Sequence, residues 1–305
     1  MRILITGGTG FIGQRLCVHL RQHGHQLTLL CRDIHKARQM FGGAEIATFA
    51  SLDEWTPDIC FDTVINLAGE PIMARRWTEQ RKKALWDSRV LLTEKLVEHM
   101  TLAHQKPAVF ISGSAVGIYG DQGDTILDET TSQFKDGFGH QLCAAWENAA
   151  LRAEQLGTRV CLLRTGLVIG NHGGFLEKML LPFRLGLGGR IGEGQQWMSW
   201  IHIDDHIGLT QHLLDSQEAR GPFNATAPNP VTNAEFTREL GKCLHRPTLL
   251  PIPAWVLKLA AGEMAELLLG SQRAVPRKAV ASGFRFSHET LESALGNVLA
   301  NQARQ

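Results

Sequence analysis

The first thirteen residues, Met1-Arg-Ile-Leu-Ile-Thr-Gly-Gly-Thr-Gly-Phe-Ile-Gly13, decide the fold class of this chain. Residues 2–5 form a short apolar run with β-branched side chains, which is typical of a buried parallel strand. Gly7, Gly10 and Gly13 then follow at intervals of three, and apolar residues at helical spacing come next. A strand, a glycine turn and a helix in this order predict a dinucleotide-binding α/β fold.

Each of the three glycines has its own expected role in such a turn. Gly7 allows the tight turn, Gly10 lets the backbone approach a pyrophosphate, and Gly13 lets the helix lie close to the strand. The amides at the start of the helix then face the phosphates. The alternative is a glycine-rich turn that binds no ligand, but the strand before it and the helix after it favour the dinucleotide site.

Size and charge narrow the class of protein. At 305 residues the chain suits one large α/β domain with an appended lobe. Its 31 basic and 30 acidic residues leave a net charge of +1, which gives no reason to expect a nucleic acid or an anionic membrane as a partner. No apolar run approaches the roughly 20 residues of a bilayer span, and the N-terminal strand breaks too early for a signal peptide. We therefore expect a cytoplasmic protein.

The cysteine pattern agrees with a cytoplasmic location. No two cysteines form a C-x-x-C pair, so we expect reduced thiols rather than disulfides or zinc ligands, and we expect no metal site. The six cysteines are Cys17, Cys31, Cys60, Cys143, Cys161 and Cys243.

The end of the second predicted strand bears on the choice of cofactor. This strand spans residues 26–30 and runs into Cys31-Arg32-Asp33. An acidic residue at this position binds the ribose hydroxyls of NAD, whereas an arginine can pair with the 2′-phosphate of NADP. Because Arg32 comes first, we expect NADP. A solvated Arg32–Asp33 pair that merely opens a loop is the alternative.

The G-x-x-G-x-x-G spacing, preceded by Thr6, resembles that of the extended short-chain dehydrogenase/reductase superfamily. The resemblance implies that the backbone of residues 66–69 (Asn-Leu-Ala-Gly), after a strand over 62–67, lies against the adenine-ribose side of the cofactor. It also places Arg89, on a helix expected over 78–104, where relatives carry a supporting asparagine. Arg89 either reaches a phosphate or ribose or is an ordinary surface arginine.

The same resemblance suggests an active-site serine. A fifth strand over 108–111 precedes a serine-rich segment, and in the superfamily a serine here binds the reacting oxygen of the substrate. Ser114 fits best, with Ser112 as the alternative. The turn at residues 164–170, which contains Val168, resembles the turn that closes over the nicotinamide side.

The usual catalytic pair of the superfamily is missing. That pair is a tyrosine and a lysine four positions later, which together move a proton to or from the substrate. The only tyrosine is Tyr119, and Gly123 follows it at four residues. Alignment on Glu147 puts Gly139 at the tyrosine position and Cys143 at the lysine position. Cys143 is therefore a candidate proton carrier or nucleophile, although a buried structural thiol is the simpler interpretation.

A narrower resemblance covers nearly the whole chain. Motifs such as Asn-Leu-Ala-Gly-Glu at 66–70 and Trp-Ile-His-Ile-Asp at 200–204 resemble an atypical subgroup, the epimerase family proteins of the 39U1 type. The subgroup implies NADP binding, loss of the tyrosine–lysine pair and a C-terminal lobe like that from about residue 249. Within the second motif we expect Asp204 to cap the following helix, and His202 to be a weaker candidate for the pocket.

Together these observations predict a Rossmann-type, doubly wound parallel sheet over residues 1–220 and a smaller C-terminal substrate lobe over 221–305. The function expected is that of an NADP-dependent oxidoreductase or nucleotide-sugar epimerase with an unknown small-molecule substrate. The alternative is a non-catalytic NADP(H)-binding regulator, which some relatives' label as cell-division inhibitors suggests. The sequence predicts no oligomeric state.

The expected catalytic residues are Ser114 and Cys143, and the expected cofactor-binding residues are Gly7, Thr9, Gly10, Phe11, Ile12, Gly13, Cys31, Arg32, Asn66, Leu67, Ala68, Gly69, Arg89 and Val168.

Overall fold

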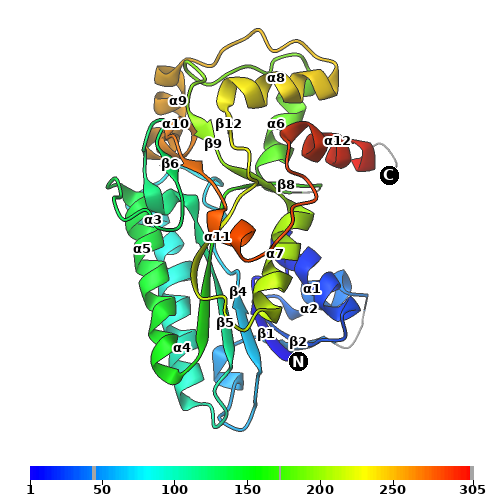
Figure 1. The fold of residues 1–305 in the computed structure, drawn as a ribbon, viewed down its shortest axis with the longest axis vertical. Helices are drawn as coiled ribbons and strands as arrows, with labels where there is room; N and C mark the ends of the chain where they lie inside the picture. The colour runs from blue at the N-terminus through cyan, green and yellow to red at the C-terminus, as the bar shows by residue number, and fades with distance from the viewer. Residues whose placement is uncertain (43–45, 172, 303–305) are drawn as a thin grey trace.

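A parallel sheet forms the centre of the molecule. The computed structural model describes residues 1–42, 46–171 and 173–302. Seven strands lie in the order β3-β2-β1-β4-β5-β7-β11, and every neighbouring pair is parallel (Figure 1). The strand order changes direction between β1 and β4, as in a Rossmann sheet, so the predicted doubly wound fold is confirmed. The strands are β1 (Arg2–Thr6), β2 (Gln26–Leu30), β3 (Ala47–Phe49), β4 (Thr63–Asn66), β5 (Val109–Ala115), β7 (Arg159–Thr165) and β11 (Gly221–Ala225).

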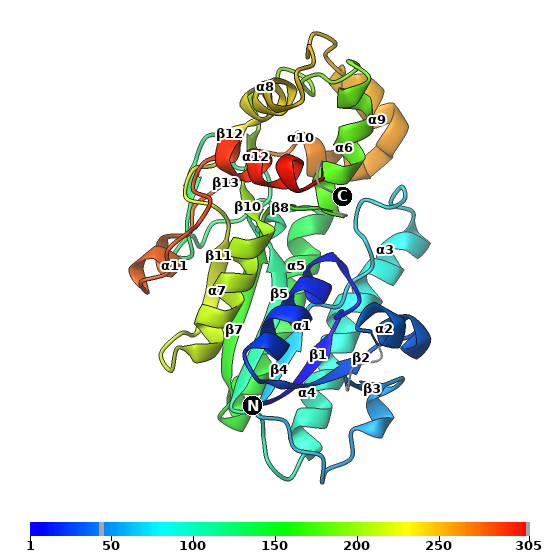
Figure 2. The same ribbon diagram turned by 90° about the vertical axis from the view of Figure 1, so that its right-hand side faces the viewer.

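Helices cover both faces of this sheet, which explains the continuous apolar run in β1. Ile3 and Ile5 belong to a core that includes residues of α1 (Phe11–Gln22) and α7 (Ile203–Asp215). Leu4 belongs to a second core, on the opposite face, that includes residues of α4 (Leu92–Leu102) and α5 (Phe138–Leu151). Figure 2 shows α1 and α7 in front of the sheet. Alternate side chains of one strand thus enter two separate cores.

The helix expected over residues 78–104 is interrupted. It consists of α3 (Glu79–Trp86), a π-helical turn η2 (Asp87–Leu91) and α4. Such π turns are rare and occur mostly as single turns inside helices, frequently at functional sites. Arg89 lies within this turn, a feature that apolar spacing alone does not reveal.

The fifth strand is longer than expected. β5 continues to Ala115, so both Ser112 and Ser114 lie within it rather than in the loop after it. β5 pairs with β4 and β7 along its length, and Ser114 lies opposite Arg164 of β7. The two serines therefore sit in the carboxyl-terminal half of a central strand.

The C-terminal lobe draws on two parts of the chain. Its core contains Ile169, Leu176, Phe236 and Leu295, and these come from β8 (Leu167–Ile169), α6 (Gly174–Arg184), α8 (Asn233–Leu244) and α12 (Leu291–Gln302). Between them the chain returns to the sheet as β11, which pairs with β7 although it follows residue 220. The lobe lies above the carboxyl ends of the strands (Figure 1).

The remaining elements are short or connect these layers. They are α2 (Ile34–Met40), η1 (Leu52–Glu54), η3 (Val116–Tyr119), β6 (Ile126–Leu127), η4 (Arg152–Leu156), β9 (Trp197–Met198), β10 (Trp200–His202), β12 (Val231–Thr232), α9 (Ala254–Ala261), η5 (Gly262–Ala265), α10 (Glu266–Leu269), β13 (Arg273–Ala274) and α11 (Arg277–Ala281). None of the helices within residues 1–42, 46–171 and 173–302 is both long and apolar enough to cross a membrane.

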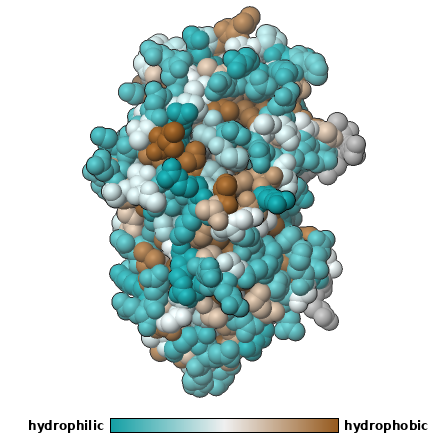
Figure 3. Space-filling model, viewed as in Figure 1, coloured by the Kyte–Doolittle hydropathy of each residue, from teal (hydrophilic) through white to brown (hydrophobic). Residues whose placement is uncertain are grey.

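Hydrophobic surface gathers on the lobe. Figure 3 shows it mainly in the upper half of the view, where the lobe lies. Large apolar side chains are exposed on α6 and in the segment through α9. They include Leu181, Leu185, Leu249, Trp255 and Leu259.

The close packing of α1 on the glycine turn predicts that Gly13 cannot be replaced by a larger residue without loss of stability. A Cβ atom at Gly13 would collide with the carbonyl oxygen of Gly7, which is backbone and cannot move aside cheaply. Gly13→Ala should therefore lower the free energy of unfolding by about 1–3 kcal/mol, as overpacking of a core does. Urea denaturation followed by circular dichroism measures this change.

Gly296→Ala is the matched control, because Gly296 is an exposed helical glycine in α12 with no heavy atom near the added Cβ. It should raise the free energy of unfolding by about 0.5–1 kcal/mol, the usual gain for glycine to alanine in a helix. Equal effects of the two substitutions would show that the contact at Gly13 does not matter.

Candidate cofactor and active site

The glycine turn packs directly against the loop after β4. Gly7 has a φ of +71°, and a Cβ on it would lie 2.6 Å from the carbonyl carbon of Leu67 and 2.8 Å from the amide nitrogen of Ala68. The amide of Gly10 donates to the carbonyl of Gly7 at 2.9 Å and closes the turn. The turn and the loop therefore lie in direct contact, with no room for larger side chains at Gly7.

The first turn of α1 has the features of an anion site. Gly10 is the N-cap, and neither a capping side chain nor an acidic residue occupies this first turn. The Phe11 ring packs on the segment from the end of β8 to the start of α6, where a Cβ at Gly170 or Gly174 would lie 2.8 or 2.9 Å from it. Backbone amides without such partners, at the positive end of a helix, are suited to a pyrophosphate. This local geometry fits a dinucleotide.

The other residues expected near the cofactor frame this turn. Thr9 and Ile12 flank the N-cap and are half-buried, whereas Cys31 is buried beyond the end of β2 and donates its amide to Phe49. Val168 is buried in β8, and its carbonyl oxygen would lie 3.1 Å from a Cβ on Gly174.

Asn66 has a structural task. Its side-chain oxygen accepts from the Thr6 hydroxyl at 2.6 Å, and its amide nitrogen donates to Thr93 at 2.8 Å. The Thr6 hydroxyl in turn accepts from the backbone amide of Ala68 at 3.2 Å. These contacts join β1, β4 and α4 and hold the 67–69 loop. Asn66 is fully buried, so its side chain acts by fixing the backbone that faces the turn.

Arg32 projects into solvent at the end of β2. Its side chain is 92% exposed, and its Nη1 lies 2.9 Å from Oε1 of Glu70. The second carboxylate oxygen of Glu70 lies 3.2 Å from Nη1 of Arg81, on α3. The hydrogen bonds from Arg81 and then Arg32 lower the pKa of Glu70, so its carboxylate is ionised at neutral pH. Sequence reasoning missed Glu70 and Arg81, since only the fold brings them beside Arg32.

Arg89 is a partly buried cation near the loop after β4. Its Nη2 donates to the carbonyl of Glu70 at 3.0 Å, and its guanidinium lies 5.5 Å from the centre of the Trp146 ring. A Cβ on Gly69 would lie 2.8 Å from Cζ of Arg89, so the guanidinium fits here only because residue 69 is a glycine. Burial lowers the pKa of Arg89. No carboxylate among the described residues forms an ion pair with Arg89.

A chain of buried polar groups runs through the region of the expected catalytic residues. The Ser114 hydroxyl donates to Oε1 of Glu147 at 2.6 Å. Arg164 donates to both carboxylate oxygens of Glu147, each at 2.9 Å. Arg164 also donates to the hydroxyl of Tyr119 at 3.1 Å, and that hydroxyl donates to Asn224 at 2.8 Å. We name these five residues the buried polar network.

This network gives the single tyrosine a structural position. Tyr119 is completely buried, and burial raises the pKa of its hydroxyl. Glu147 and Arg164 form a two-pronged ion pair, the strongest geometry available to these groups. The sequence contained both residues, but no spacing rule joins a helix residue to a strand residue across the sheet.

Cys143 lies one helical turn before Glu147, in a core cluster against which Ala115, the residue after Ser114, packs. Its thiol is buried, and burial, followed by the charge of Glu147, raises its pKa to about 12. The thiolate that a nucleophile requires is therefore scarce at neutral pH. A neutral thiol can still donate a proton. Gly139, at the expected tyrosine position, lies on the same helix, and a Cβ there would meet only the carbonyl of Gly117 at 3.9 Å.

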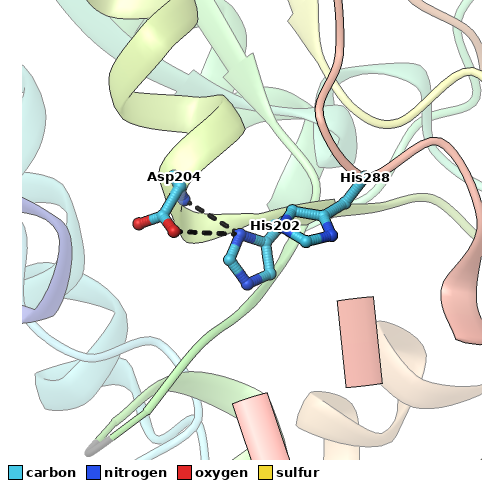
Figure 4. A group of neighbouring side chains, drawn as sticks. All are labelled: His202, Asp204 and His288. Atoms are coloured by element: carbon cyan, nitrogen blue, oxygen red, sulfur yellow. Dashed lines mark hydrogen bonds and ion pairs between the residues drawn. The ribbon is translucent and has the colours of Figure 1, made fainter. Parts of the chain in front are cut away.

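Three potential metal ligands meet where the lobe joins α7 (Figure 4). They are His202, Asp204 and His288, whose ligand atoms lie within 4.8 Å of one another. Nδ1 of His202 already accepts the Asp204 amide at 3.2 Å, which makes His202 the N-cap of α7. The prediction of Asp204 as the cap is thus wrong, because α7 begins at Ile203, two residues earlier than expected. The neighbouring Asp205 accepts from the backbone amides of Ser287 and His288 and ties the segment before α12 to α7.

A surface cleft of about 470 Å³ lies between α3, the start of α5 and the η5–α10 segment. It is separate from the glycine turn and opens beside the N-terminus of α5. Its lining residues combine aromatic and charged groups, namely Glu79, Lys82, Lys83, Trp86, Phe138, Gln141, Glu263 and Glu266.

Comparison with known proteins agrees with this geometry. The NAD-dependent epimerase/dehydratase family pattern matches residues 3–225, and a domain of unknown function, DUF1731, matches residues 252–298. The chain is 39% identical to the mouse (Mus musculus) epimerase family protein SDR39U1, over 98% of this chain and 100% of that protein. It is 36% identical to epimerase family protein YfhF of Bacillus subtilis, over 99% of each.

Solved structures show the same relationship. The human epimerase family protein SDR39U1 (isoform 2), crystallised with NADPH, superposes with a TM-score of 0.89 at 36% identity, over 99% of this chain and 100% of that one. A UDP-glucuronic acid 4-epimerase from Bacillus cereus superposes with a TM-score of 0.79 at 17% identity, over 100% of this chain and 99% of that one, which shows a common fold.

Two buried histidines predict acid sensitivity. Burial lowers the pKa of His202 and of His206 from 6.5 to about 4. Because the unfolded chain binds these protons more tightly, the free energy of unfolding should fall as the pH drops from about 6.5 to 4. His206→Gln should reduce this slope by up to about 1.4 kcal/mol per pH unit.

Denaturant titrations at several pH values measure the slope. His35→Gln, at an exposed position of α2, is the matched control and should leave the wild-type curve unchanged. A His206→Gln curve parallel to that of the wild-type protein would contradict the prediction.

Proposed function

Because this chain belongs to the NAD-dependent epimerase/dehydratase family, in its SDR39U1 branch, we propose that it binds NADP(H) at the glycine turn. The observation that carries the proposal is the close packing of Gly7 on Leu67, which leaves the uncapped first turn of α1 open beside the 67–69 loop. A pyrophosphate then binds the α1 amides. The 2′-phosphate that distinguishes NADP from NAD binds Arg32, at the end of β2.

We further propose an oxidoreductase or epimerase activity on a small molecule with a carbonyl or hydroxyl group. When bound, NADP(H) supplies the hydride chemistry. Ser114 is the expected hydrogen-bond donor to the reacting oxygen, and its present acceptor, Glu147, keeps the hydroxyl oriented. Cys143, as a neutral thiol one helical turn before Glu147, is the candidate proton donor on the helix that carries the tyrosine–lysine pair in other members of the superfamily.

A non-catalytic NADP(H)-binding regulator is the second candidate. One observation favours it: Arg164 contacts both Tyr119 and Glu147, so these three groups hold structural positions in the buried polar network. Under this alternative the protein retains the cofactor-binding site without catalysis, and bound NADP(H) changes its affinity for a partner.

The role of Arg32 makes the first prediction from this proposal. Arg32→Ala should weaken NADPH about 10- to 100-fold, the loss expected for charged hydrogen bonds of 1.5–3 kcal/mol, and should change NADH affinity less than about 3-fold. Fluorescence titration of both reduced cofactors measures the two dissociation constants. Arg38→Ala, at an exposed arginine of α2, is the control. Equal losses for both cofactors would contradict a phosphate role.

Turnover separates the two candidate functions. The experiment follows NADPH oxidation, and label exchange from NADPH, across a panel of nucleotide sugars and small carbonyl compounds. For an active substrate, Cys143→Ala should lower kcat by about 100-fold or more, as removal of a general acid does, while Cys60→Ala should not. Tight NADPH binding without any turnover on the panel supports the regulator.

A further inference from the structure

The carboxylate of Glu70 contacts the guanidinium of Arg32, the group proposed to bind the 2′-phosphate. One carboxylate oxygen contacts Nη1 of Arg32 at 2.9 Å, and the other contacts Nη1 of Arg81 at 3.2 Å. Glu70 thus bridges the guanidinium of Arg32, just after the end of β2, and that of Arg81, near the start of α3. We call Arg32, Glu70 and Arg81 the arginine bridge.

The two arginines of the bridge differ in freedom. The Arg81 side chain is only 14% exposed, and its Nη2 also donates to the carbonyl of Pro71 at 2.6 Å. The Arg32 side chain is 92% exposed, and its ion pair with Glu70 is its sole ion pair within the described residues. Arg32 can therefore exchange partners, whereas Arg81 stays in place.

The backbone of Glu70 is also held in place. Its amide donates to the Ser88 hydroxyl at 3.0 Å, and its carbonyl accepts from Nη2 of Arg89 at 3.0 Å. Both partners lie in the π turn after α3. The carboxylate therefore stays near Arg32 whether or not a ligand is present.

A fixed carboxylate and a phosphate compete for one guanidinium. The planar carboxylate and the tetrahedral phosphate both accept hydrogen bonds from the same N–H groups of a guanidinium. An ion pair with one partner this exposed has little intrinsic strength, so a more highly charged phosphate can displace it. Glu70 nevertheless repels the arriving phosphate, and the charge of Arg81 offsets that repulsion.

We propose that the arginine bridge sets cofactor selectivity, with Glu70 occupying Arg32 until a 2′-phosphate replaces it and Arg81 neutralising the carboxylate that is released. This inference rests on the proposed NADP(H) site and names two further positioning residues for it. A cofactor without the 2′-phosphate leaves the Arg32–Glu70 pair intact and gains nothing from either arginine. Selectivity then depends on the balance of charge within the bridge as well as on Arg32.

The test measures NADPH and NADH dissociation constants for Glu70→Gln, Arg81→Met and the double variant. Glu70→Gln should tighten NADPH about 2- to 5-fold, the equivalent of a weak exposed ion pair, and leave NADH within about 2-fold. Arg81→Met should weaken NADPH by a similar factor, because Glu70 then repels the phosphate without compensation. The double variant should return NADPH affinity to at least the wild-type value.

Two controls match the charge changes on the same helix, α3. Glu79→Gln removes an exposed carboxylate that pairs with Lys82, and Lys83→Met removes an exposed cation that pairs with Asp87. Neither should change the ratio of the NADH to the NADPH dissociation constant. The ratio is the deciding readout, since a folding defect weakens both cofactors together.

Weaker NADPH binding by Glu70→Gln, with NADH unchanged, would overturn the inference and make Glu70 a support for Arg32. NADPH binding by the double variant as weak as that of Arg81→Met alone would overturn the role of Arg81, because Arg81 would then act without the Glu70 charge. Failure of the proposed function looks different, because the wild-type protein would then bind neither NADPH nor NADH. Loss of selectivity in Arg32→Ala together with an unchanged ratio in Glu70→Gln would leave the cofactor site standing and reject the bridge.

Discussion

The close approach of three backbone segments at Gly7 and Gly13 is the constraint on which the rest of the molecule depends. At Gly7 the turn lies on the loop after β4, and at Gly13 the helix lies on the turn. Neither contact admits a side chain. The contact at Gly13 puts the N-terminus of α1 at the switch point of the strand order, where parallel α/β sheets bind their ligands. The contact at Gly7 brings the 67–69 loop, and with it Glu70, Arg81 and Arg89, to the same edge of the sheet.

The buried polar network joins two hydroxyls, a carboxylate and a guanidinium into one set of contacts. Glu147 receives both Ser114 and Arg164, and Arg164 also holds Tyr119. Burying an ion pair is expensive unless every lone pair and proton has a partner, which is why the tyrosine and asparagine are drawn in as well. Cys143 lies beside this arrangement with a raised pKa, as an uncharged thiol next to a fixed carboxylate. A ligand bound beside Ser114 would therefore meet charges that are already paired.

Sequence reasoning found those parts of the candidate site that are local in the chain. The glycine turn follows its own strand directly, and Arg32 comes within two residues of the end of the second strand, so each could be recognised from a few residues.

Residues whose positions depend on distant segments were missed or were assigned the wrong role. Glu70 and Arg81 meet Arg32 only because β1 lies between β2 and β4 in the sheet. Asn66, whose backbone is expected beside the cofactor, turns its side chain inward to Thr6 and Thr93, and no local pattern predicts these partners. The cap of α7 was displaced from Asp204 to His202 because an imidazole can accept a backbone hydrogen bond, a possibility that lies outside the usual set of capping residues.

By itself, the sequence determined the parallel α/β fold, the position of the dinucleotide turn and the absence of a tyrosine–lysine pair at the usual spacing. These follow from apolar periodicity, glycine spacing and residue identity, which are properties of short segments. The tertiary structure alone decided which polar groups pair, since that depends on strand order and on the π turn that carries Arg89. It also decided that the opening glycines do more than accommodate phosphates. They bring a carboxylate to Arg32, because the turn can lie this close to the backbone of Leu67 and Ala68 only where it carries no side chain of its own, as at Gly7.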